Sequence, residues 1–150
     1  MEFIFATADT SFNCTRCSRC CSLDVMLSDR EMEALGRDAD PKWHTTRKVF
    51  KGKEPVCCEL QGNACTIYTT RPKLCRIYPF FAIPVADLEA IGEAVPDSAL
   101  RIMANGEAYV VAYDDRCPGM GQKGPLDLAE IVSITIDHRS EFEPPINPVA

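Results

Sequence analysis

Cys14-Thr-Arg-Cys17-Ser-Arg-Cys20-Cys21 is the densest cysteine run in the sequence. It contains two Cys-x-x-Cys steps in tandem, and each step allows two thiolates to converge on one metal. Adjacent residues rarely direct both sulfurs to the same tetrahedral ion. We therefore expect Cys20 and Cys21 to serve different centres, or different atoms of one cluster. The run predicts a fold that is organised around bound metal.

Further cysteines follow along the chain, which has nine in 150 residues. Eight of them make a candidate ligand set that fits two four-thiolate sites of zinc or iron–sulfur type, or one cluster plus four cysteines with another purpose. This set is Cys14, Cys17, Cys20, Cys21, Cys58, Cys65, Cys75 and Cys117.

The expected strand pattern excludes the ninth cysteine, Cys57, from this ligand set. If residues 56–60 form a strand, side chains alternate between its two faces. Val56, Cys58 and Leu60 then share one face, and the charged Glu59 marks the other face as the solvent side. We expect Cys58 to face the metal centre and Cys57 to be a free thiol.

The odd number of cysteines argues against a closed set of disulfides. The N-terminus lacks the basic region of a secretory signal peptide, so we expect a cytoplasmic protein. In the reducing cytosol, closely spaced cysteines are more often metal ligands than disulfides. Disulfides and buried free thiols remain the alternatives.

The composition fits one soluble globular domain. Hydrophobic residues make up 46% of the chain and charged residues 25%. The net charge of −6 argues against nucleic acid as a partner. The longest apolar stretch, 78–86, is interrupted by Pro79 and Pro84 and is too short to span a membrane.

Local patterns predict a small, irregular α+β domain, with short helices and hairpins around cysteine-ligated metal. Ser28 and Glu31 form a capping-box pattern that predicts a helix over 29–35. Polar residues 38–53 predict a loop. A hairpin is expected between 56–60 and 65–68, and Thr70 could cap a short helix over 71–75.

The second half of the chain has stronger signals. Val and Tyr residues predict a strand over 107–113, which pairs with 100–103 across Asn105-Gly106. A helix is expected over 126–138, followed by an extended tail to residue 150. We expect one domain over 1–150, with the motif region at about 12–124.

The sequence contains no catalytic constellation, which favours an accessory or electron-transfer protein over a stand-alone enzyme. Four thiolates leave excess negative charge that attracts hydrogen-bond donors. Arg76, next to Cys75, is the candidate for this cofactor-contacting role, whereas Arg71 and Pro72 are expected to be structural.

The motifs resemble those of the YkgJ-type CxxCxxCC family of zinc- or iron-chelating domains. The resemblance covers most of the chain, from about residue 12 to 124. The opening motif is Phe12-Asn-Cys14-Thr-Arg-Cys17-Ser-Arg-Cys20-Cys21. The central block consists of Cys58-Glu-Leu60, Cys65-Thr-Ile67-Tyr68, Arg71-Pro72 and Cys75-Arg76-Ile-Tyr78-Pro79-Phe80. The late turn is Cys117-Pro-Gly119-Met-Gly121. Ser18 departs from the family, in which many members have glycine, and Cys57 is additional.

The resemblance implies metal binding through these cysteines, including the assignment of a ligand to Cys58. A similar cluster in flagellin lysine methylases suggests a redox or methyl-transfer context. Our first interpretation is a protein that binds an iron–sulfur cluster, with [4Fe–4S] favoured, in a redox, electron-transfer or accessory role. The number of cysteines leaves room for a second metal site. A protein redox partner or client enzyme is then expected. The alternatives are a zinc-stapled interaction module and a component of a methyl-transfer system.

Overall fold

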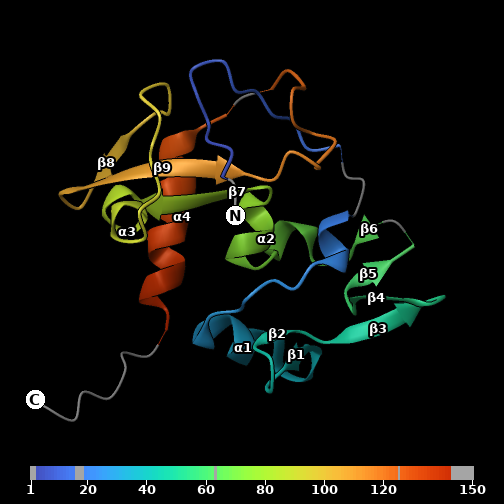
Figure 1. The fold of residues 1–150 in the computed structure, drawn as a ribbon. Helices are drawn as coiled ribbons and strands as arrows, with labels where there is room; N and C mark the ends of the chain where they lie inside the picture. The colour runs from blue at the N-terminus through green and yellow to red at the C-terminus, as the bar shows by residue number, and fades with distance from the viewer. Residues whose placement is uncertain (1–2, 16–18, 63, 125, 143–150) are drawn as a thin grey trace, which may run out of the picture.

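A three-stranded antiparallel sheet in the order β7-β9-β8 forms the centre of one half of the structure (Figure 1). The computed structural model describes residues 3–15, 19–62, 64–124 and 126–142. The strands are β7 (Phe80–Pro84), β8 (Ile102–Ala104) and β9 (Glu107–Tyr113). The helices of this half are α2 (Lys73–Ile77), α3 (Val85–Ala90) and α4 (Leu128–Ser140).

The β8–β9 hairpin confirms the pairing predicted across Asn105-Gly106. Asn105 has φ 51° and Gly106 has φ 74°, the left-handed values that a tight two-residue hairpin turn requires. Strand β7 was not predicted, because prolines flank its apolar residues. Proline is tolerated there because β7 lies at the edge of the sheet, where a missing N–H costs no internal pairing.

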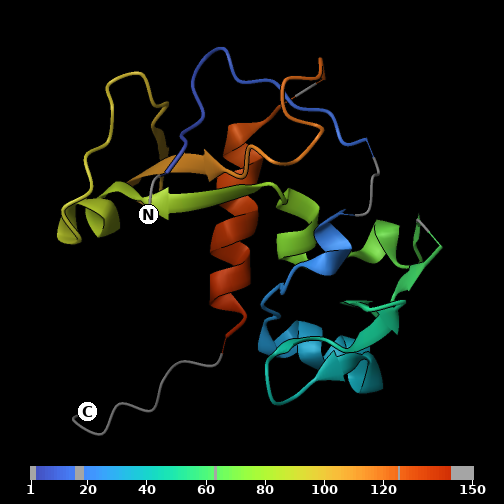
Figure 2. The same cartoon turned by 45° about the vertical axis from the view of Figure 1, so that its right-hand side comes forward.

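Both faces of the sheet are covered, so the central strand β9 is buried: Val110, Val111 and Ala112 are fully inaccessible. Helix α4 and the neighbouring α2 pack against one face, with Phe80, Ile131 and Val132 in the main core (Figure 2). A second, smaller core lies on α3, around Leu88. Helix α4 begins at Leu128, two residues later than expected, because the Asp127 side chain caps it by accepting a hydrogen bond from the Glu130 N–H (3.1 Å).

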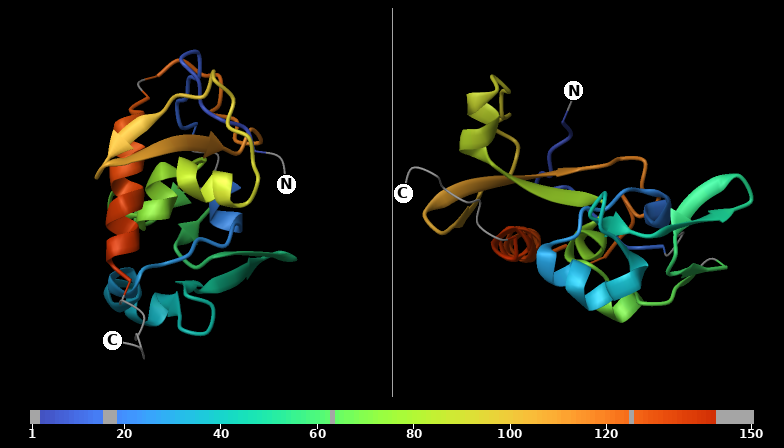
Figure 3. Two further views of the ribbon diagram at one scale, coloured as in Figure 1. Left: turned by 60° about the vertical axis from the view of Figure 1, so that its left-hand side comes forward. Right: turned by 90° about the horizontal axis from the view of Figure 1, so that it is seen from below.

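The cysteine-rich half contains short elements and three two-stranded sheets (Figure 3). They are η1 (Arg19–Ser22), α1 (Asp29–Leu35), η2 (Gly36–Asp38), β1 (Ala39–Asp40), β2 (Thr45–Thr46), β3 (Lys48–Lys51), β4 (Glu54–Cys57), β5 (Leu60–Gln61), β6 (Ala64–Cys65) and η3 (Tyr68–Thr70). Helix α1 has the predicted bounds and capping box. The Ser28 Oγ accepts the Glu31 N–H (3.2 Å) and the Glu31 carboxylate accepts the Ser28 N–H (3.0 Å).

Several expectations for this half were wrong. Residues 38–53 are not one loop, because β1 pairs with β2 and β3 pairs with β4. The expected hairpin exists only as the short β5–β6 pair, since β4 turns back onto β3 instead. Helix α2 begins at Lys73, and Thr70 ends the preceding helix η3.

A cluster of polar side chains ties helix α1 to α2 and α4. The Ser28 hydroxyl donates to the Glu141 carboxylate (2.9 Å), which also forms an ion pair with Lys73. The Lys73 N–H donates to Glu31 (2.6 Å), and the buried His138 ring lies 3.1 Å from the Met26 carbonyl. These contacts hold the start of the cysteine-rich half against the sheet half.

The structure confirms the predicted fold class, a small mixed α+β domain. The extended tail expected over 143–150 lies outside the described residues. None of the described helices has the length and apolar character needed to cross a membrane.

Candidate metal centre

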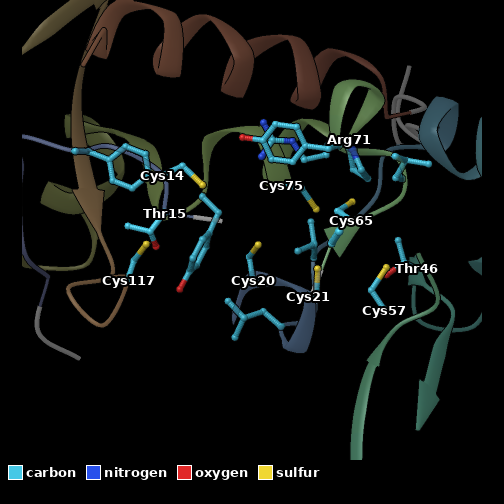
Figure 4. Close-up of a pocket in the computed structure, with 18 residues that line it drawn as sticks. Cys14, Thr15, Cys20, Cys21, Thr46, Cys57, Cys65, Arg71, Cys75 and Cys117 are labelled. Carbon is cyan, nitrogen blue, oxygen red and sulfur yellow. The ribbon is translucent and has the colours of Figure 1, made fainter. Parts of the chain in front are cut away.

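One cavity of about 150 Å³ gathers most of the cysteines (Figure 4). Of the eight described cysteines, seven line it: Cys14, Cys20, Cys21, Cys57, Cys65, Cys75 and Cys117. Cys17 lies outside the described residues. The cavity therefore contains six of the eight predicted ligands, together with Cys57.

Five of these thiols form an inner group: Cys20, Cys21, Cys57, Cys65 and Cys75. They come from four separate elements, since η1 provides two and β4, β6 and α2 provide one each. Figure 4 shows Cys20, Cys21, Cys65 and Cys75 in the middle of the cavity and Cys57 beside them. These thiols are close enough to interact electrostatically, since the charges of Cys20, Cys57 and Cys65 each raise the pKa of the Cys75 thiol.

The other two thiols, Cys14 and Cys117, form an outer pair at the opposite end of the cavity (Figure 4). The Asn13 N–H donates to the Gly119 carbonyl (3.0 Å), which joins the segment before Cys14 to the turn after Cys117. A Cβ on Gly119 would lie only 2.6 Å from the Asn13 carbonyl oxygen. Glycine is therefore required at this position because the two segments approach so closely.

The inner group differs from expectation at Cys57 and Cys58. Strand β4 ends at Cys57, whose side chain lines the cavity beside Thr46. The chain turns at Cys58, so the alternation of strand faces does not extend to it. The Cys58 Sγ instead lies 3.7 Å from the Asp38 carbonyl oxygen and 4.0 Å from the Glu59 carboxylate.

The arginine in the cavity also differs from the one that was expected. Arg76 is exposed on α2 and is not among the lining residues, whereas Arg71 is. The Arg71 guanidinium stacks 3.8 Å above the Tyr68 ring. Its Nε is buried without a hydrogen-bond partner. Arg71 is the one charged side chain other than the thiols among the described lining residues, so it brings a cation and an unpaired donor to the sulfurs.

Sequence reasoning missed Arg71 because Arg71-Pro72 reads as the start of a turn. The signal that could have identified it is its position between Cys65 and Cys75. The neighbour of a ligand in sequence, Arg76, instead points away because helix α2 turns it to solvent.

The thiols of the inner group have very different proton affinities. Burial raises the pKa of the Cys75 thiol to about 12. A hydrogen bond from the Cys21 thiol lowers the pKa of Cys20 to about 6, and the same contact raises the pKa of Cys21. At neutral pH, Cys20 is therefore the thiolate that a metal meets first, while Cys75 must lose its proton.

This difference predicts a pH dependence of metal binding. Metal displaces a proton from each protonated thiol, so affinity should rise about tenfold per pH unit for each such thiol. Cys75 contributes to this rise at every pH below about 12, and Cys20 only below about 6. Titration with Co²⁺, followed by its thiolate absorption at several pH values, measures the slope. An affinity independent of pH would contradict the assignment of protonated thiols as ligands.

The fold and the cavity define a small domain in which dispersed elements direct cysteines to one point. The family model of the CxxCxxCC domain, described as "Putative zinc- or iron-chelating domain", matches residues 13–118. The chain belongs to this family. No curated protein and no solved structure matches it.

Proposed function

We propose that the cysteine cavity binds an iron–sulfur cluster and that the protein acts in electron transfer or as an accessory to a redox enzyme. The inner group would hold the cluster, with Cys57 and three of the other four thiols as ligands. When bound, such a cluster accepts and releases single electrons. The outer pair, Cys14 and Cys117, would provide two ligands to a second metal.

The separation of the sulfurs carries this proposal. In a mononuclear zinc site the Zn–S bonds are about 2.3 Å long, which places the sulfurs about 3.8 Å apart. Yet in the part of the chain that the structure describes, no three cavity cysteines have all their sulfurs within 4.8 Å of one another. The group of three ligand atoms that does meet this spacing is Asp38, Cys58 and Glu59, which are not among the lining residues of the cavity. An inorganic core of iron and sulfide bridges sulfurs that lie farther apart.

The cavity itself supports the same proposal. Histidine and carboxylates are absent from the described lining residues, and an all-sulfur donor set suits iron–sulfur clusters. Tyr68, Tyr78 and Phe12 provide an aromatic wall that would limit access of water.

Anaerobic purification followed by iron, zinc and acid-labile sulfide analysis tests the proposal. We expect a brown protein with similar amounts of iron and sulfide. Colourless protein that contains zinc and no sulfide, after reconstitution with iron and sulfide has also failed, would contradict it and favour the zinc-stapled module.

The unpaired Arg71 Nε leads to a prediction about redox behaviour. A cation beside the cluster stabilises the reduced form, which carries more negative charge. Arg71→Gln should therefore lower the reduction potential, as measured by redox titration of the visible absorption. Arg76→Gln is the matched control, because it removes the same charge from the exposed side of α2. Equal shifts in the two variants would show that Arg71 has no specific contact with the cluster.

A further inference from the structure

Residues 41–53 carry a charge opposite to that of the rest of the protein. This basic segment contains five of the 16 Lys and Arg residues, which are Lys42, Arg47, Lys48, Lys51 and Lys53. It contains none of the 22 Asp and Glu residues, although Glu54 follows Lys53 directly in the hairpin. Eleven basic residues therefore face all 22 acidic ones elsewhere, so that the remainder of the chain has a net charge of −11. Arg47 and Lys48 form ion pairs with Asp38 and Asp24, so Lys42, Lys51 and Lys53 carry the excess positive charge.

The basic segment also exposes aromatic surface. Phe50 is 76% exposed and Trp43, which stacks with Lys42 at 5.1 Å, is 66% exposed. Aromatic residues are enriched at protein–protein interfaces relative to the rest of the surface.

The β3–β4 hairpin places Phe50 close to the cysteine cavity. Phe50 pairs with Pro55, and Lys48 pairs with Cys57. Residues two apart on a strand share a face, as do directly paired residues, so Phe50 lies on the same face of the hairpin as Cys57. The two pairs are about 7 Å apart along the strand. A partner on Phe50 would therefore lie next to the cavity wall.

The base of the hairpin is fixed, whereas its tip projects. The Lys48 ammonium donates to the Leu23 carbonyl (2.7 Å), and β4 packs against η1, which contains Cys20 and Cys21. On the other face, Lys51 donates to the Gly62 carbonyl (2.8 Å). Figure 1 shows the end of the hairpin extending beyond the neighbouring elements. A projection that is held at its base in this way presents Phe50 and Lys53 to a partner.

We propose that the β3–β4 hairpin is the docking surface for an acidic protein, with Phe50 as its apolar anchor and Lys53 as an electrostatic contact. The apolar surface is small, which suits a short-lived complex of the kind that redox proteins form. The docking surface does not depend on the identity of the bound metal. The further step, in which the partner exchanges electrons with the cavity, rests on the proposed function.

A protein fits this surface better than a nucleic acid does. DNA carries one negative charge per roughly 1.7 Å of helix and extends past a small hairpin, so it would be repelled by the remainder of the protein with its charge of −11. An acidic patch on a protein is local and can contact the hairpin alone. Such complementarity speeds association and weakens as salt screens it.

The test uses a fluorescein-labelled peptide of glutamate and leucine residues, with binding measured by anisotropy on the full chain as purified. We expect Lys53→Glu to weaken binding at least threefold at low salt and Phe50→Ser at least fivefold. Lys123→Glu and Ile91→Ser make the same changes at exposed positions outside the segment and should leave binding unchanged. Equal weakening by variants and controls would overturn the proposal.

Two further arms separate the other possible occupants. Tighter binding of a labelled DNA duplex than of the peptide, abolished by Lys53→Glu, would replace the protein partner with nucleic acid and overturn the proposal. Self-association in sedimentation velocity that Phe50→Ser abolishes would identify a second copy of this chain instead. Metal analysis of the same samples keeps the two proposals distinguishable: metal-loaded protein that fails to bind the peptide contradicts only the docking surface, whereas the reconstitution with iron and sulfide described above decides the proposed function.

Discussion

Removal of metal should unfold the cysteine-rich half of the protein and leave the sheet half folded. The two halves have very different apolar cores. Among the described residues between 14 and 75, only Leu27, Ala39 and Val56 are buried hydrophobic residues. By contrast, the sheet half has the two cores that cover both faces of β9. A structural metal can contribute on the order of 10 kcal/mol to the free energy of folding. Without metal, the cysteine-rich half loses this contribution and has little apolar core to replace it.

Hydrogen exchange of metal-free protein, prepared by acid treatment and chelation, provides the measurement. We expect amides of β3 to β6 and of η1 to lose protection, whereas amides of β7 to β9 and of α4 keep it. Helix α1 should keep partial protection, because Ser28 and Glu31 bind it to Lys73 and Glu141.

The control for this experiment is the same protein reloaded with metal after the acid step, which should regain the protection. Unchanged protection in β3 to β6 of the metal-free protein would show that packing alone holds this half. Loss of protection throughout the chain would show instead that the two halves fold as one cooperative unit.

The elements that sequence predicted correctly have local causes. The bounds of α1 follow from the contact between Ser28 and Glu31, which are three residues apart. The β8–β9 hairpin follows from the left-handed conformation of Asn105 and Gly106. Such signals are complete within a few residues, so they do not depend on the remainder of the chain.

The differences from expectation concern positions that only tertiary contacts determine. The sequence of strand β3, Lys48-Val49-Phe50-Lys51, does not alternate between apolar and polar residues, and Phe50 is exposed in the structure. The pattern that identifies a half-buried strand is therefore missing. Arg71 reaches the cavity although Arg76 is the one adjacent to Cys75 in sequence. Six of the eight predicted ligands nevertheless lie in one cavity. Sequence could select them because cysteine is a rare residue, so a dense set of cysteines indicates a site without knowledge of the tertiary structure.

Replacement of Cys57 by serine and replacement of its neighbour Cys58 by serine should have different effects on metal binding. The Cys57 side chain lines the cavity, while Cys58 lies beside Asp38 and Glu59. Cys57→Ser should therefore reduce the metal content by at least half, and Cys58→Ser should leave it unchanged. This reverses the expectation from the strand pattern and from the family motif.

The two variants are matched controls for each other, since each replaces one sulfur with oxygen at adjacent positions. Metal content per folded chain is measured after purification under identical conditions, with circular dichroism to confirm that both variants fold. Reactivity toward a maleimide adds a second readout. In metal-loaded wild-type protein Cys57 should resist labelling and should become reactive once the metal is removed, because a bound thiolate is not available as a nucleophile.

The opposite result has a definite structural meaning. If Cys58→Ser loses metal and Cys57→Ser retains it, the metal-loaded protein must continue β4 through Cys58, with its side chain turned from Asp38 toward the cavity. Such a change would break the Cys58 contacts to the Asp38 carbonyl and the Glu59 carboxylate. In its present position, burial raises the pKa of the Cys58 thiol to about 11, so this thiol is protonated at neutral pH. Because Cys57 reaches the cavity without these changes, we expect it to be the ligand.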